Sequence, residues 1–239
     1  GGGIALNALL VAHLEQSGKF AGVFTHPAAG NAGNAMGAAL HVAHQVLRIE
    51  LRDELAHLFL GPEYSDEEIK EVLDNSKLTF RYLPQRREII VDAVQALQQD
   101  RILGWFQGRM EFGPRALGAR SILASPLGKY VNENLNHYVK HRESFRPFAA
   151  AVQAEVAGEY FDFSGSSRFL TSVGQVKEKH RERFVSNLLA APEQRASSER
   201  RIRVQVVERE TNRYLWDLLA GFGRVDHVVR RNRVHRDAR

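Results

Sequence analysis

The sequence contains no cysteine among its 239 residues. Neither a disulfide framework nor a metal site built on thiolates is therefore possible. The sequence also lacks any apolar run close to the roughly 20 residues that a membrane-spanning helix needs, and its first residues do not resemble a signal peptide. These absences predict a cytoplasmic protein that does not cross a membrane.

Hydrophobic residues make up 44% of the chain and charged residues 26%. At this length, the chain can bury one large core or two modest ones, and we expect two. Helical and strand patterns occur together, which favours a mixed α/β (α+β) fold. The chain begins Gly1-Gly2-Gly3 without a methionine and passes directly into a helical pattern. Because a glycine turn that opens a helix normally follows a strand, we expect the downstream part of a larger protein.

Acidic residues are scarce between Arg109 and Arg146. Three glutamates face seven basic residues there, so this segment carries +4 of the net charge of +5. Such a focused excess is typical of a pocket for an anion. A nucleic-acid surface more often spreads its Lys and Arg and adds exposed aromatic residues, whereas we expect Trp105, Phe106 and Phe112 to be buried.

Two strings contain most of these basic residues: GWFQGRMEFGPRALGARSILASP from Gly104 to Pro126, and VKHRESFRPFAA from Val139 to Ala150. Arginine presents a planar fork that matches phosphate oxygens, and lysine adds a point charge. Glycine lets the backbone approach a ligand closely. The strings therefore predict a site for a polyphosphate or an acyl phosphate, and its candidate residues are Arg109, Arg115, Arg120, Lys140, Arg142 and Arg146. Pairing of these arginines with acids or with helix carboxyl ends is the alternative.

Glycine-rich turns open two helices near the start of the chain. The string GGIALN precedes a helix expected to end near Gln16, and PAAGNAGNAMGAAL leads into a second helix through about Leu47. A short strand is predicted between them, over residues 21–25. Such turns present free amides and the positive end of a helix to phosphate, which predicts contacts at Gly2, Gly3, Gly30 and Gly33. Close packing of helices is the alternative, since short glycine motifs often occur by chance.

Further elements are predicted from spacing. Ser65 and Glu68 have the spacing of a capping box, and residues 82–87 make a plausible boundary between two units. A helix over 88–99 leads into a buried strand over 102–106. The later expectations are a strand over 169–172, a charged helix over 176–189, a loop over 192–201, a strand over 202–206, and a helix capped by Thr211.

Five strings, taken in order, carry a specific resemblance: GGIALN, PAAGNAGNAMGAAL, GWFQGRMEFGPRALGARSILASP, VKHRESFRPFAAAV and VQVVERETNRYLWDLLAGFG. They resemble the O-carbamoyltransferase family of the NodU nodulation protein, to which the cephalosporin and tobramycin carbamoyltransferases also belong. The likeness extends to Arg224, and the FQGRMEFGPRALG string is highly specific.

The resemblance implies the end of an actin-like, ATPase-superfold domain over residues 1–60, a linker over 61–84 and a YrdC-like domain over 85–225. In this family the YrdC-like domain joins carbamoyl phosphate to ATP, which gives carbamoyl adenylate. The actin-like domain then passes the carbamoyl group to a hydroxyl of a sugar, an antibiotic or a Nod-factor type of acceptor. We accordingly expect ATP and carbamoyl phosphate as ligands and a small-molecule acceptor.

The resemblance also implies roles for individual residues. Lys140 and Arg142 match the Lys-x-Arg motif of YrdC-like domains and are implied to be catalytic. The residues implied to bind carbamoyl phosphate or ATP are Arg109, Arg115, Arg120 and Arg146. In the actin-like part, the GGxxxN element and the second glycine string imply nucleotide contacts at Gly2, Gly3, Asn7, Gly30 and Gly33.

The sequence departs from the family at its metal site. Family members hold a divalent metal, iron or magnesium, with two histidines upstream and an aspartate in a PAAGDAG string. This chain has Asn31 in place of that aspartate. An amide oxygen can still coordinate a metal, but the loss of a charge weakens the expectation that this chain alone binds one.

The sequence also departs after Arg224, where the family continues with a strand and a string like LNTSFN. This chain reads VDHVVRRNRVHRDAR instead. We expect residues 226–239 to be an aberrant basic tail, left by a frameshift or an altered end, and the polypeptide to be incomplete for catalysis. An undisturbed reading frame through Arg239 at the locus would contradict this expectation.

Two other functions stay open from the sequence alone. A noncatalytic nucleotide- or RNA-binding module on a YrdC-like fold would have the same arginine placement. A sugar kinase of the actin-like class would leave the FQGRMEFGPRALG string unexplained. We rank a nucleic-acid partner below a small-molecule acceptor and expect no membrane partner, while the acceptor's identity and the oligomeric state are not predicted.

Overall fold

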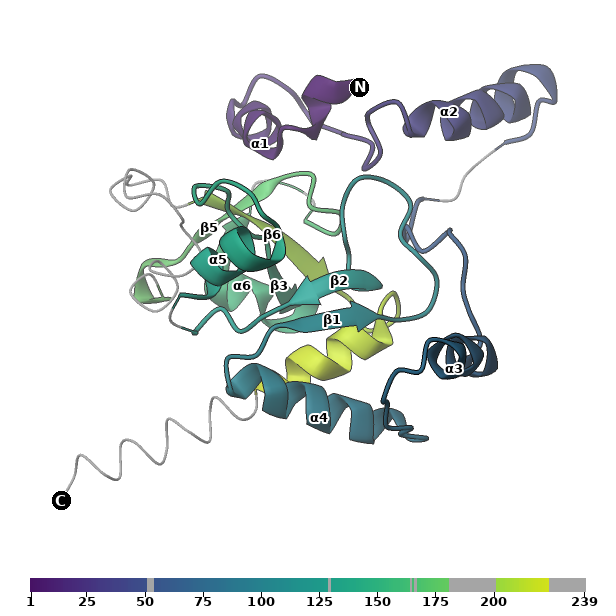
Figure 1. Cartoon of the computed structure of the whole chain (residues 1–239). Helices are drawn as coiled ribbons and strands as arrows, with labels where there is room; N and C mark the ends of the chain where they lie inside the picture. Colours follow the sequence, from purple (N-terminus) through teal and green to yellow (C-terminus); the bar gives the residue numbers. More distant parts are fainter. Residues whose placement is uncertain (51–53, 129, 164, 166, 181–200, 224–239) are drawn as a thin grey trace.

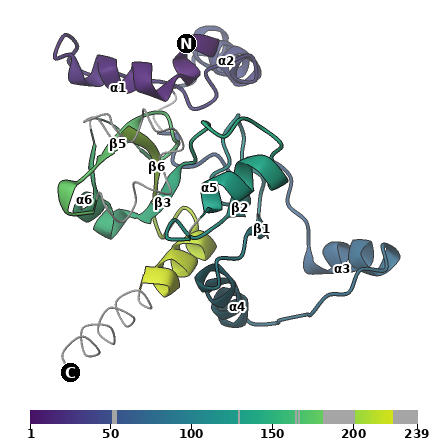
Figure 2. The same cartoon turned by 60° about the vertical axis from the view of Figure 1, so that its left-hand side comes forward.

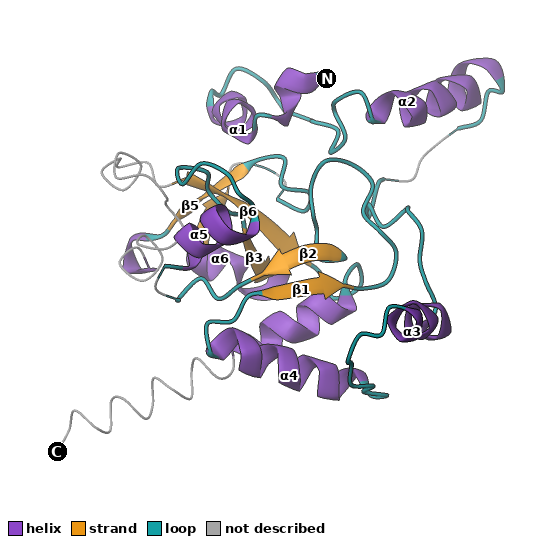
Figure 3. Cartoon of the chain, in the orientation of Figure 1, coloured by secondary structure: helices purple, strands orange, loops and turns teal. Residues whose placement is uncertain are grey.

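The computed structural model describes residues 1–50, 54–128, 130–163, 165, 167–180 and 201–223. Its strands form two sheets (Figures 1 and 3). The strands are β1 (Leu103–Phe106), β2 (Arg120–Leu123), β3 (Ala150–Gln153), β4 (Phe161–Phe163), β5 (Val173–Val176) and β6 (Arg201–Val207). The expected mixture of helices and strands is therefore confirmed.

The larger sheet has the strand order β3-β6-β5-β4. Strands β3 and β6 run parallel, with Ala150 opposite Val204, whereas β6 with β5 and β5 with β4 are antiparallel. Strands β1 and β2 form a separate antiparallel pair, with Trp105 opposite Ser121. The run that contains the glycines and arginines connects these two strands, so the β1–β2 pair supports both of its ends.

Two apolar clusters stabilise these sheets. The first lies where α4 (Arg86–Gln98) and a helix over 213–223, yellow in Figure 1, meet β1 and β6. Its buried members are Ile90, Ala93, Val94, Leu97, Trp105, Val207, Leu215 and Leu218. The second joins the larger sheet to α6 (Ala157–Tyr160) and contains Val152, Ala157, Phe161, Val176, Ile202 and Val204. Both clusters lie downstream of residue 85.

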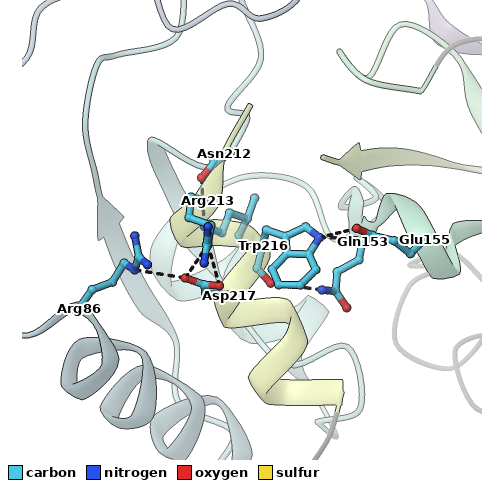
Figure 4. A network of polar contacts seen from close by, with 8 residues as sticks. Arg86, Gln153, Glu155, Asn212, Arg213, Trp216 and Asp217 are labelled. Carbon is cyan, nitrogen blue, oxygen red and sulfur yellow. Dashed lines mark hydrogen bonds and ion pairs between the residues drawn. The ribbon is translucent and has the colours of Figure 1, made fainter. Parts of the chain in front are cut away.

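A polar network fixes the helix over 213–223 (Figure 4). The Asp217 carboxylate is shared by Arg213 on the same helix and by Arg86 of α4, with N to O distances of 3.2 Å in both cases. On the other side, the Trp216 indole donates to Glu155, at 3.0 Å. Because Asn212 Oδ1 accepts from the Leu215 amide, Asn212 caps this helix and the expected cap at Thr211 is wrong.

The N-terminal segment consists of η1 (Gly3–Leu6), α1 (Ala8–Gln16), α2 (Gly33–His41) and the π-helical η2 (Val42–Val46). Asn7 caps α1, since its Oδ1 accepts from Leu9 N at 3.1 Å. Figure 2 shows α1 lying over β5, where Ala8 and Ala12 pack on Val173. The expected strand over 21–25 is wrong, because these residues have no strand partner in the described chain and Phe24 is 85% exposed.

Residues 55–62 pack on the downstream unit, although the sequence placed most of them with the first domain. Leu58 is buried with Leu117 and Leu170, and the backbone pairs with residues 110–112 through Phe59 and Glu111. The expected boundary at residue 60 therefore does not coincide with a break in packing. After it, α3 (Asp66–Asn75) has the expected capping box and buries no residue. It stands away from both sheets in Figures 1 and 2.

Other expectations need correction or lie outside the described residues. The strand expected over 169–172 begins later, as β5, and Val176 belongs to this strand rather than to a helix. Residues 181–200, with most of the expected charged helix and loop, and the tail over 226–239 lie outside the described residues. The remaining short helices are α5 (Val131–Asn134), the π-helical η3 (Leu135–Val139), η4 (Ala154–Val156) and η5 (Glu178–His180). No helix in the described ranges has the length and hydrophobicity that crossing a membrane requires.

Candidate functional site: a cationic cavity

The buried carboxylate of Glu111 holds the GPRALGAR loop between β1 and β2. Its Oε1 accepts from the amides of Leu117 and Ala119, each at 2.7 Å, and both oxygens accept from the Arg120 amide at 3.1 Å. Glu111 therefore binds backbone rather than an arginine side chain. The loop also needs Gly118, whose φ of +97° favours glycine and whose Cβ, if present, would lie 2.4 Å from the Leu215 side chain.

A sharp turn at the end of η3 presents Lys140 and Arg142. The helix ends at Val139 with Lys140 as its C-cap, and the left-handed backbone of His141 (φ 45°) turns the chain. The fully buried Asn136 then fixes the residues after this turn. Its Oδ1 accepts from Arg142 Nε at 2.6 Å, and its Nδ2 donates to the carbonyls of Ser144 and Arg146. The Lys-x-Arg pair is thus held on a rigid turn.

These two elements and β6 enclose a cavity of about 330 Å³. Four basic side chains line it: Arg115, Lys140, Arg142 and Arg203. No Asp or Glu belongs to its described lining. Two of the strings identified in the sequence therefore meet at one site, and Lys140 and Arg142 lie in it together, as expected.

Arg203 was not anticipated from the sequence. It lies on β6 between Ile202 and Val204, which are buried in the second cluster, so the alternation of the strand turns Arg203 toward the opposite face. The sequence signal that could have identified Arg203 is a charged residue between two apolar residues in a predicted strand. The described part of the chain offers its side chain no hydrogen bond or ion pair.

The cavity charges repel one another. Burial, with contributions from Arg115, Arg142 and Arg146, lowers the pKa of Arg203 to about 10. Burial also lowers the pKa of Arg115. For Arg142, burial and Arg146 lower the pKa, and Glu143 partly offsets them. All these groups stay charged at neutral pH, and an anion in the cavity would relieve their repulsion.

Three other candidate arginines are placed differently. Arg109 donates to the carbonyls of Gly61 and Leu60. Arg120 donates to carbonyls on both sides of the β1–β2 connection and lies 3.5 Å above the centre of the Phe106 ring. Neither residue lines the cavity. Arg146 is exposed, lies 3.6 Å from Glu143, and affects the cavity through its charge on Arg203.

The aromatic residues of this region only partly match expectation. Trp105 is buried and Phe112 is partly buried. Phe106, however, is 54% exposed, because the strand alternates and its outward face carries the Arg120 guanidinium. The expected burial of Phe106 is wrong.

The glycine strings of the N-terminal segment contact each other. Gly2 N donates to Ala29 O at 2.8 Å, so this amide is already used. A Cβ on Gly33 would lie 2.1 Å from Ala28 O, which gives this glycine a packing reason. Gly30 lies near the Leu6 side chain, Gly3 begins η1, and Asn7 caps α1.

Asn31 is exposed. The described residues contain no group of three or more His, Cys, Asp or Glu side chains that could hold a metal ion. The residues around Asn31 therefore do not fit a divalent metal, and we derive no chemistry from one.

A second cavity, of about 160 Å³, adjoins the cationic one and is mainly apolar. The two share lining residues from β2 and β3, including Leu123, Ala150 and Ala151. In its wall, the Nδ2 of buried Asn132 has no hydrogen-bond partner among the described residues. A charged compartment thus lies beside an uncharged one.

Comparison with known proteins gives a family match over more than half of the chain. Residues 94–229 match the family described as the carbamoyltransferase C-terminus. The match covers all four cavity cations and continues past Arg224.

Individual relatives align over most of the chain. The nodulation protein NolO of Bradyrhizobium diazoefficiens is 36% identical, over 92% of this chain and 39% of its own length. The nodulation protein NolNO of Sinorhizobium fredii is 34% identical, over 92% and 32%. The 3'-hydroxymethylcephem-O-carbamoyltransferase of Amycolatopsis lactamdurans is 29% identical, over 92% and 38%. The chain thus spans about two fifths or less of the length of these relatives. By the match to its C-terminal family, the chain belongs to the carbamoyltransferases.

Proposed function

We propose that this chain is part of an O-carbamoyltransferase and that its cationic cavity binds carbamoyl phosphate and ATP. The product formed there is carbamoyl adenylate. One water is consumed, and phosphate and pyrophosphate leave. The carbamoyl group then passes to a hydroxyl of a small-molecule acceptor, which loses its proton, and AMP leaves. Membership of the carbamoyltransferase family and the activity named for the cephem relative support this proposal.

The observation that carries the proposal is the cluster of Arg115, Lys140, Arg142 and Arg203 around one cavity without an acid in its described lining. Phosphoryl groups spread negative charge over several oxygens, and fixed cations stabilise charge that builds up on a departing pyrophosphate. Because Glu111 and Asn136 hold the two loops rigidly, these cations need little reorganisation.

We assign each part of the chain accordingly. Residues downstream of about 85 form the YrdC-like part that makes the adenylate, and the adjoining apolar cavity gives room for an uncharged portion of the nucleotide. Residues 1 to about 54 belong to an actin-like part that carries out transfer. Arg109 and Arg120 support the loop through carbonyl contacts rather than by binding phosphate.

Calorimetric titration of the chain with pyrophosphate, carbamoyl phosphate and ATP tests the cavity. We expect Lys140→Ala to weaken pyrophosphate binding about tenfold or more, because a charge-assisted contact is lost. The matched control is Lys70→Ala on the exposed α3, where Lys70 pairs with Asp74. The pyrophosphate affinity of this control should be unchanged. Equal pyrophosphate affinities of Lys140→Ala and Lys70→Ala would argue against pyrophosphate binding in the cavity.

Turnover is tested on a full-length carbamoyltransferase that includes this segment, by exchange of labelled pyrophosphate into ATP. Exchange should depend on carbamoyl phosphate and be lost in Lys140→Ala. Exchange that persists without carbamoyl phosphate would contradict adenylate formation. RNA binding with a steep salt dependence, and no pyrophosphate binding, would favour a nucleic-acid module instead.

A further inference from the structure

Arg115 contacts two parts of the molecule at once. It lines the cationic cavity with Lys140, Arg142 and Arg203. Its Nη2 donates to the carbonyl of Leu6 at 2.8 Å, in the η1 turn directly before the helix cap Asn7. The structure shows no carboxylate partner for Arg115 among the described residues.

The loop that carries Arg115 also contacts the second glycine string. Gly113 has a φ of +104°, and a Cβ there would lie 3.4 Å from the Ala28 Cβ. Ala28 is buried, and the adjacent Ala29 accepts the hydrogen bond from Gly2 N. One short loop therefore packs against both glycine strings and also supplies a cation to the cavity.

We infer that Arg115 is a positioning residue that couples an anion in the cavity to the ordering of η1 and α1. This inference depends on the proposed function only in that the cavity binds an anion. A guanidinium is planar, so one hydrogen bond to Leu6 O restrains the direction of its remaining N–H groups. These remaining N–H groups can bind an oxyanion. An anion that binds them therefore also stabilises the hydrogen bond between the guanidinium and Leu6 O.

Coupling of this kind is reciprocal. If an anion stabilises the contact between Arg115 and Leu6, a change that releases η1 and α1 must weaken anion binding, by at most the factor by which the anion stabilises this contact. Outside the cavity, the Ser172 hydroxyl donates to Glu15 Oε2 at 2.6 Å and ties α1 to the start of β5. Ser172 does not line the cavity, so it can be used to probe the coupling from its far end.

The first test measures hydrogen exchange of the amides of residues 3–16 with and without saturating pyrophosphate. In the wild type we expect exchange to slow about fivefold or more. Arg115→Lys keeps the charge but lacks the planar guanidinium. In this variant, saturating pyrophosphate should not slow exchange over residues 3–16. Arg142→Lys is the matched control. It should bind pyrophosphate more weakly, yet at saturation show the wild-type slowing, because Arg142 has no contact with η1.

The outcomes separate the coupling from the proposed function. Pyrophosphate binding to the wild type without slower exchange over residues 3–16 would overturn the coupling and leave the cavity assignment standing. A full response in Arg115→Lys would overturn it too. Absence of pyrophosphate binding in the wild type would contradict both.

The second test is Ser172→Ala, a small change that removes only the hydroxyl. Exchange over α1 should speed up, and by reciprocity the pyrophosphate affinity should fall, by up to about fivefold when α1 is released in most molecules. An affinity equal to that of the wild type in a variant whose α1 amides exchange as freely as released ones would show that α1 and the cavity are independent. Thr211→Ala is a control for loss of a hydroxyl. The Thr211 hydroxyl donates to Glu208 O and Thr211 does not line the cationic cavity, so the affinity should be unchanged.

Discussion

Burial and the neighbouring guanidinium of Arg115 lower the pKa of Arg203, which comes to about 10. The two residues come from distant parts of the sequence, one on the β1–β2 loop and one on β6, and meet only in the folded chain. Since both stay charged at neutral pH, their repulsion is unrelieved until an anion binds. This repulsion lowers the stability of the ligand-free chain, which is typical of residues that bind a ligand rather than stabilise the fold.

Replacing Arg203 should therefore separate stability from binding. Arg203→Met keeps much of the aliphatic side chain and removes the charge. We expect the free energy of unfolding of the ligand-free chain to rise by about 1 kcal/mol, a value reduced for solvent screening. Pyrophosphate affinity should fall at least about tenfold. Denaturant unfolding and calorimetric titration measure the two quantities.

The control for this change is Lys19→Met, which removes one positive charge from an exposed position outside the cavity lining. It should change neither stability nor affinity appreciably. If Arg203→Met destabilised the chain by as much as a buried core truncation, packing rather than charge would explain the position of Arg203.

The stability difference between Arg203→Met and the wild type should depend on pH. The pKa of Arg203 is about 10 in the folded chain, well below its ordinary value, so the charged form costs stability at neutral pH. This cost lessens as pH rises through about 10, because folded Arg203 then loses its proton. The advantage of the variant should be constant from about pH 7 to 9 and shrink above it. An advantage that grows above this range would contradict the assigned sign.

Asn136 should contribute both to pyrophosphate binding and to stability, because it positions Arg142. Asn136→Ala leaves Arg142 Nε and the carbonyls of Ser144 and Arg146 without their partner. We expect a loss of about 2 kcal/mol in the free energy of unfolding and weaker pyrophosphate binding, since Arg142 is no longer fixed. Asn134→Ala, at an exposed position of the preceding helix α5, is the control. Wild-type affinity in a folded Asn136→Ala protein would show that Arg142 needs no such support.

Much of the local structure could be predicted from the sequence. The Ser65 capping box, α4 and β1 are expected from spacing and periodicity and are confirmed. The strand expected over 21–25 does not form, because a strand needs a partner and apolar composition alone does not supply one. The strand expected near residue 170 is displaced, because β5 is positioned by its pairing with β6 rather than by local composition.

The site was predictable where its residues lie in the two basic strings, which supply Arg115, Lys140 and Arg142. Lys140 and Arg142 lie two positions apart, so their proximity is expected from the sequence. Arg203 enters through a distant strand, and Asn136 acts through side-chain contacts that no pattern encodes. Arg109 and Arg120 show the opposite effect. They belong to the specific string, but the carbonyls of neighbouring loops bind their guanidinium groups.

Carbonyl contacts of this kind hold Arg120. Its guanidinium donates to Gln107 O, Ala119 O and Gly108 O at 3.0 to 3.1 Å. Arg120→Met should lower the free energy of unfolding by about 1 to 2 kcal/mol, because several modest hydrogen bonds are lost, while pyrophosphate affinity should stay within about twofold of the wild type. Arg115→Met, in the same loop, should instead weaken pyrophosphate binding and leave the free energy of unfolding nearly unchanged. A folded, stable Arg120→Met protein with pyrophosphate binding weakened about tenfold would place Arg120 among the ligands, and titration of both variants decides between these outcomes.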